Sequence, residues 1–115
     1  MYTRFEVYKD SYKRGLLTCL DEIGLSIDII EELSEHFDKY LKVPNFYYEK
    51  GKKAKRDVFA YFTDRGLEFF KEDIESICNI VKEKGYEISI IKQDKVGSAR
   101  LVYEDKFQAL IRRKW

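Results

Sequence analysis

The alternation of apolar and polar residues is most regular between residues 57 and 93, where it predicts a strand, a long helix and a second strand. Residues 58–62 and 86–91 are strand-like, and residues 65–84 repeat apolar positions three and four residues apart. This spacing places the apolar side chains on one helical face, wide enough to cover a sheet. The predicted face comprises Leu67, Phe70, Ile74, Ile77, Cys78 and Val81.

Residues at both ends of this predicted helix are typical of helix caps. Asp64 precedes the helix and can accept hydrogen bonds from its first amides, and Gly85 follows it and favours a left-handed end. Lys82 and Lys84 suit the negative end of the helix dipole. Because a strand, helix and strand usually close as a right-handed unit, we expect a parallel crossover.

The N-terminal third predicts a strand followed by two helices. Residues 3–8 alternate as in a half-buried strand, and Asp10 or Ser11 would cap a first helix that ends at Gly24. The apolar face of this first helix is predicted to comprise Tyr12, Leu16, Leu17, Leu20 and Ile23.

Ser26 is predicted to begin the second helix, and Pro44 stops it. The inner face of this second helix is predicted to comprise Ile30, Leu33, Phe37, Tyr40 and Leu41.

The remaining segments predict further antiparallel strands. Residues 45–49 are aromatic and strand-like, and residues 50–56 resemble an exposed turn. Residues 100–103 and 107–111 predict a hairpin that turns at Glu104 and Asp105.

We therefore expect a single α+β domain over residues 1–115, a two-layer sandwich with a mixed β-sheet and helices packed on one face. The first seven elements match a ferredoxin-like βαββαβ pattern with one extra helix, followed by a C-terminal hairpin.

Composition supports a folded core but indicates no ligand. Of 115 residues, 44% are hydrophobic and 16% aromatic, and the net charge is only +1, so electrostatic recognition must come from local patches. Cys19 and Cys78 are expected to be reduced, buried thiols of a cytoplasmic protein. The first residues do not resemble a signal peptide, and no apolar run approaches the ~20 residues of a membrane span.

The sequence favours a non-enzymatic protein without a cofactor or metal. It contains no Cys-x-x-Cys pair, His-Glu-x-x-His motif, Gly-rich phosphate loop or nucleophile elbow. The single histidine, His36, follows Glu32 by four residues, but two ligands do not complete a metal site, and we expect a solvated histidine. Paired carboxylates remain open as a catalytic alternative, since the chain has 21 acidic residues.

Acidic residues dominate the two predicted helices around Gly24. Residues 21–41 contain seven acidic residues and one lysine, a net charge of −6, which excludes a DNA-binding helix-turn-helix. We predict a small protein-interaction or regulatory domain that docks a partner through an aromatic edge or through its acidic helix face, which would offer Glu31, Glu35 and Asp38 to a basic partner. The partner would be a protein, or a site that normally receives nucleic acid. Small size and a Lys-, Tyr- and Ile-rich composition suit an accessory protein of a bacterium or its phage.

A basic stretch beside aromatic residues suggests RNA or single-stranded DNA binding as the alternative. Cations would contact phosphates and rings would stack on bases, although a solvated loop explains the same residues. The residues concerned are Tyr47, Tyr48, Lys50, Lys52, Lys53, Lys55, Arg56, Arg112 and Arg113. Opposite local charges also allow head-to-tail assembly into a homo-oligomer.

Overall fold

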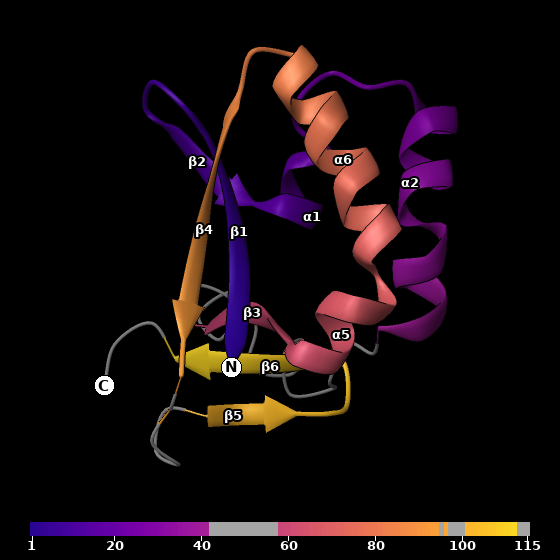
Figure 1. Cartoon of the computed structure of the whole chain (residues 1–115). Coiled ribbons are helices and arrows are strands. Elements are labelled where there is room, and N and C mark those ends of the chain that lie inside the picture. Colours follow the sequence, from indigo (N-terminus) through magenta and orange to yellow (C-terminus); the bar gives the residue numbers. More distant parts are fainter. Residues whose placement is uncertain (42–57, 95, 97–100, 113–115) are drawn as a thin grey trace. The chain divides into compact units, whose positions relative to one another are not determined.

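The computed structural model describes residues 1–41, 58–94, 96 and 101–112 (Figure 1). These residues fall into two compact units. Unit 1 comprises the described residues of Met1–Thr3, Leu41–Phe69 and Lys92–Trp115, and unit 2 comprises those of Arg4–Tyr40 and Phe70–Ile91. The described elements are β1 (Tyr2–Lys9), β2 (Tyr12–Gly15), α1 (Leu16–Cys19), α2 (Ile27–Tyr40), β3 (Val58–Thr63), α5 (Asp64–Phe69), α6 (Lys71–Glu83), β4 (Glu87–Gln93), β5 (Leu101–Glu104) and β6 (Gln108–Arg112).

This combination of helices and strands confirms the predicted α+β class. The assignment of residues 1–115 to a single domain stays a prediction.

Strand pairing is antiparallel. Hydrogen bonds link the strands in the order β2-β1-β3-β6-β5, and β4 pairs with β1. The pairs β1–β2, β1–β3, β3–β6 and β5–β6 are antiparallel, and β1 and β4 run in opposite directions in Figure 1. The sheet is therefore antiparallel where we expected a mixed one. β1 pairs with both β3 and β4, so the two strands of the predicted crossover are not paired with each other.

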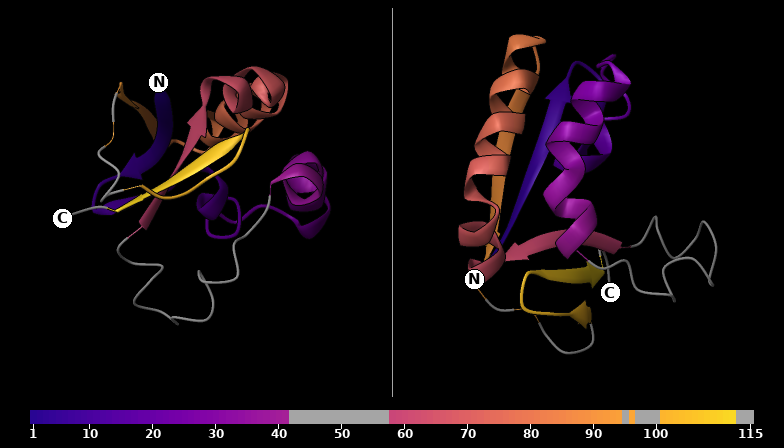
Figure 2. Two further views of the ribbon diagram at one scale, coloured as in Figure 1. Left: turned by 90° about the horizontal axis from the view of Figure 1, so that it is seen from below. Right: turned by 90° about the vertical axis from the view of Figure 1, so that its right-hand side faces the viewer.

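In unit 2, α2 and α6 lie side by side over one face of β1 and β4 (Figures 1 and 2). The rings of Phe37 in α2 and Phe70 before α6 are stacked, with centroids 4.6 Å apart. Both rings are buried, as are Ile74, Ile77 and Val81 along α6. The predicted packing of helices on one face of the sheet is confirmed for this unit.

The predicted first helix is largely wrong, because its first half is the strand β2. Asp10 adopts a left-handed backbone, with φ of 55°, and Lys9 pairs with Tyr12 across a tight turn. The buried carboxylate of Glu6 lies 3.4 Å from Lys13 Nζ on β2, and this pairing favours the hairpin over a helix.

Only Leu16–Cys19 is helical in this segment, as α1. Leu16, Leu20 and Ile23 are nevertheless buried as predicted, and Gly24 has a φ of 83°. Three of the five predicted core residues are therefore correct, whereas Tyr12 and Leu17 are only half-buried and the predicted helix was wrong.

The predicted helix over residues 65–84 is two helices. The backbone leaves helical geometry at Phe70, with φ −98° and ψ 14°, and this break separates α5 from α6. The Gly66 amide donates to Thr63 Oγ1 (3.0 Å), so Thr63 rather than Asp64 caps α5. Gly85 has a φ of 89° and ends α6, as predicted.

In unit 1, β6 lies between β3 and β5, and α5 contacts the turn between β5 and β6. Thr63 Oγ1 donates to the Lys106 carbonyl oxygen (2.6 Å), and the Thr63 amide donates to that of Phe107 (3.1 Å). The predicted C-terminal hairpin is confirmed, with an irregular register between Leu101 and Tyr103. The predicted strand 45–49, turn 50–56 and Pro44 lie outside the described residues.

Gly66 permits this close contact, because a Cβ there would overlap the Phe107 carbonyl oxygen. We expect Gly66→Ala to lower the free energy of unfolding by about 2 kcal/mol or more, although alanine favours helices. Urea unfolding followed by circular dichroism would measure this loss.

Gly24→Ala is the matched control. Nothing lies within 4 Å of a Cβ at Gly24, so only its left-handed backbone should cost stability, about 1–2 kcal/mol. A Gly66→Ala protein as stable as the wild type would contradict the tight contact between α5 and the turn.

Candidate functional site

The exposed face of α2 carries the acidic residues that the sequence singled out. Phe37 is the one buried residue of this helix. Glu31, Glu35 and Asp38 are exposed, and their spacing of four and three residues places them on one side. Asp28 and Glu32 are also exposed. Within the described part of the chain, none of these five carboxylates forms an ion pair.

Apolar side chains border this acidic face. Ile27 is 72% exposed, and Ile29 and Tyr40 are each 40% exposed. Tyr40 was predicted to face inward, but it lies at the end of α2, with Lys39 Nζ 5.3 Å from its ring centroid. The helix therefore presents both carboxylates and apolar surface to solvent.

His36 connects α2 to α6. Its Nδ1 lies 3.1 Å from both carboxylate oxygens of Asp73, and its side chain is 58% exposed. His36 is therefore near the surface, as expected, but its partner is on another helix and not Glu32. Among the described residues, no group of three or more His, Cys, Asp or Glu side chains is placed to hold a metal ion.

The two cysteines are free thiols. Cys19 is buried and donates to the Leu16 carbonyl oxygen (2.9 Å), whereas Cys78 is only half-buried. Burial raises the pKa of Cys19 to about 12 and also raises the pKa of Cys78. Since the thiolate is the reactive form, these environments disfavour cysteine chemistry at neutral pH.

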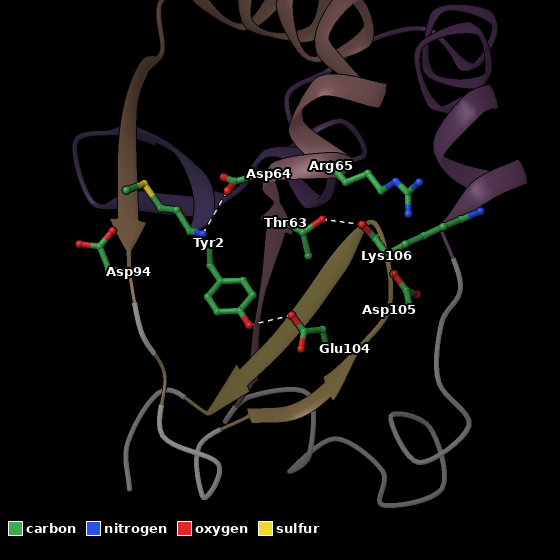
Figure 3. A pocket seen from close by; sticks show the side chains of 9 residues that line it. Tyr2, Thr63, Asp64, Arg65, Asp94, Glu104, Asp105 and Lys106 are labelled. Atoms are coloured by element: carbon green, nitrogen blue, oxygen red, sulfur yellow. Dashed lines mark hydrogen bonds and ion pairs between the residues drawn. The ribbon is translucent and has the colours of Figure 1, made fainter.

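Unit 1 contains an open polar pocket of about 390 Å³ (Figure 3). The start of β1, the start of α5 and the β5–β6 turn supply most of its lining. The lining residues are Met1, Tyr2, Thr63, Asp64, Arg65, Asp94, Glu104, Asp105 and Lys106.

Hydrogen bonds within unit 1 already engage several groups of this polar pocket. The Tyr2 hydroxyl donates to Glu104 (2.7 Å), and this bond, with a smaller effect of burial, raises the pKa of Tyr2. The Met1 amino group lies 3.2 Å from Asp64. These contacts connect β1 to α5 and β5. The polar groups that form them therefore stabilise the fold of unit 1, and no ligand is needed to account for them.

Asp105 orders the β5–β6 turn. Its Oδ1 accepts from the Phe107 and Gln108 amides (2.9 and 3.0 Å), and its Oδ2 accepts from the Tyr103 hydroxyl (2.7 Å). Burial alone would raise the pKa of Asp105, but these hydrogen bonds together lower it. The ionised carboxylate therefore stabilises the turn.

Arg65 and Lys106 extend away from the Tyr2–Glu104 pair in Figure 3. Neither forms an ion pair with another described residue. Sequence reasoning missed both residues, because only the fold brings them to one pocket. The available signal was Gly66, since a glycine inside a predicted helix often indicates a close backbone approach.

The predicted nucleic-acid contacts come from the basic stretch, its neighbouring tyrosines, Arg112 and Arg113. The residues of the basic stretch, its neighbouring tyrosines and Arg113 lie outside the described residues, and Arg112 is the last residue of β6.

Comparisons with known protein families, curated proteins and solved structures gave no significant match. No helix of the described ranges is long and apolar enough to cross a membrane.

We expect Asp105→Asn to lower the free energy of unfolding by about 1 kcal/mol at pH 7, since hydrogen bonds to a charged group are the stronger ones. The native pKa of Asp105 is below its ordinary value. The stabilisation should therefore be complete above about pH 4 and disappear as pH falls through the native pKa.

Urea unfolding of the wild-type and Asp105→Asn proteins at pH 7 and at pH 3 tests this dependence of stability on pH. A difference in stability that persists unchanged at acid pH would show that the charge of Asp105 is not responsible.

Proposed function

We propose that this chain is a small protein-interaction domain that binds a basic segment of a partner protein through the exposed face of α2. The observation that carries this proposal is the set of five exposed carboxylates on α2, which form no ion pair with described residues.

Repulsion among these carboxylates makes a basic partner favourable. Asp28 and Glu32, and likewise Glu31 and Glu35, are four residues apart. Each such like-charge pair destabilises an isolated helix by about 0.2–0.5 kcal/mol. Lysine and arginine side chains of a partner would remove this repulsion, steer the encounter and select against acidic partners.

The apolar border gives such a partner a surface to cover. Ile27 and Ile29 lie near the start of α2, and Tyr40 is its last residue. Tyrosine suits interfaces because its ring buries area while its hydroxyl remains hydrated. A bound segment that combines basic and apolar residues would match both properties of the helix.

The helix is already held in place for binding. The stacking of Phe37 on Phe70 and the contact of His36 with Asp73 fix α2 against α6. A preformed surface loses less conformational entropy on association than a flexible one. Recognition through α2 therefore requires no rearrangement within unit 2.

The test begins with peptides selected from a random display library against the wild-type protein, followed by measurement of their affinities. We expect the selected peptides to be rich in lysine and arginine. Changing Glu31, Glu35 and Asp38 together to lysine should weaken their binding at least tenfold, and added salt should weaken wild-type binding.

The matched control changes Glu72, Glu75 and Glu83, three exposed acidic residues of α6, to lysine. This variant has the same net charge as the α2 variant but should keep most of the affinity. Equal losses in both variants would indicate a nonspecific charge effect, and no loss in the α2 variant would exclude this helix as the binding surface.

A further inference from the structure

A second pocket in unit 1 lies between α5 and the β5–β6 turn. It has a volume of about 430 Å³ and is lined by Arg65, Glu68, Phe69, Lys106 and Phe107. Small-molecule sites commonly have volumes of about 300–1,000 Å³.

A pair of parallel aromatic rings forms one wall of this pocket. Phe69 is 48% exposed, and its ring stacks on that of the buried Phe107 with centroids 4.6 Å apart and planes at 24°. Lys106 Nζ lies 4.9 Å from the Phe107 ring centroid. The exposed ring of Phe69 therefore rests on the ring of Phe107, and Phe107 in turn lies near the Lys106 ammonium group.

Two cations border the same wall. Arg65 precedes Phe69 by four residues, so both lie on one face of α5, and Lys106 comes from the turn. Both cations are exposed and form no ion pair with described residues. With Glu68 as the single carboxylate of the lining, the pocket has a net charge of +1.

The backbone holds these groups together before any ligand binds. The hydroxyl and amide of Thr63 donate to the carbonyl oxygens of Lys106 and Phe107. Gly66 brings α5 against the turn, because no side chain separates its backbone from Phe107. The residues from α5 and from the turn are therefore fixed next to one another.

We propose that this pocket binds a nucleotide unit, with the base stacked on Phe69 and the phosphate held by Arg65 and Lys106. Single-strand binding proteins combine these same elements, a ring for the base and cations for the backbone. The arginine fork suits phosphate, and Glu68 can accept hydrogen bonds from amino groups of the base or ribose hydroxyls. An acidic peptide would use the cations but would offer no planar base to stack on Phe69.

The experiment measures fluorescence anisotropy of a labelled oligothymidylate and calorimetric binding of AMP. The first probe represents a strand and the second a free nucleotide. We expect Phe69→Ala, and also Phe69→Leu, to weaken the better-bound probe about tenfold or more. Phe69→Leu retains an apolar side chain without a stacking surface, so its loss would not reflect an unfolded pocket.

Arg65→Gln and Lys106→Gln should each weaken binding several-fold. For the strand, two phosphate contacts predict that log affinity falls with log salt at a slope of about −1.4, and each substitution should reduce this slope by about 0.7. Lys82→Gln and Ile90→Ala, which change an exposed cation and an exposed apolar side chain of unit 2, are the matched controls and should have no effect.

Further variants separate this pocket from the other candidate surfaces. Changing Lys52, Lys53, Lys55 and Arg56 to alanine should leave the dependence on Phe69 intact, and changing Glu31, Glu35 and Asp38 to lysine should not abolish binding.

No binding of either probe, or binding that ignores Phe69 and Arg65, would overturn the proposal. Equal affinity for tripolyphosphate without a role for Phe69 would reduce the pocket to an anion site. Preferential binding of a phosphopeptide through the same residues would assign it to a different partner. Each of these results would also overturn the proposal.

Discussion

The backbone break at Phe70 is the constraint on which the two described units both depend. Phe70 is fully buried and stacks on Phe37, the one buried residue of α2. Phe69, its neighbour in the chain, is half-exposed and stacks on Phe107 of unit 1. Two consecutive aromatic rings thus belong to different units, and an end to α5 before α6 begins lets each ring take its own partner.

Periodicity predicted the parts of this chain in which local pattern and tertiary packing agree. The apolar face of α6, the buried position of Phe37 in α2, the glycines at 24 and 85 and the C-terminal hairpin all follow from residue spacing and backbone preference. It failed at Tyr12–Gly15, because residues three and four apart suggest a helix while the buried carboxylate of Glu6 favours a neighbouring strand. The break at Phe70 could not be predicted from the spacing of apolar residues, since the apolar face continues across it.

The candidate sites differ in whether their residues come from one segment of the chain or from several. The acidic face of α2 lies within one helix, so its spacing could be seen in the sequence. The pocket beside α5 combines Arg65 and Phe69 with Lys106. The hydrogen bonds of Thr63, the contact at Gly66 and the stacking of Phe69 on Phe107 bring these segments together. The two surfaces also have opposite charge, which a net charge of +1 for the chain conceals.

The pairing of β3 with β6 has a consequence for how the protein is made. β3 has nearly its whole length matched by β6, the last described strand, so much of its hydrogen-bonding edge lacks a partner until β6 has been synthesised. On the ribosome, the apolar residues 58–62 emerge long before their partner strand does. A chain whose translation pauses between α6 and β6 would therefore expose an aggregation-prone edge, and chaperone protection would matter most in that interval.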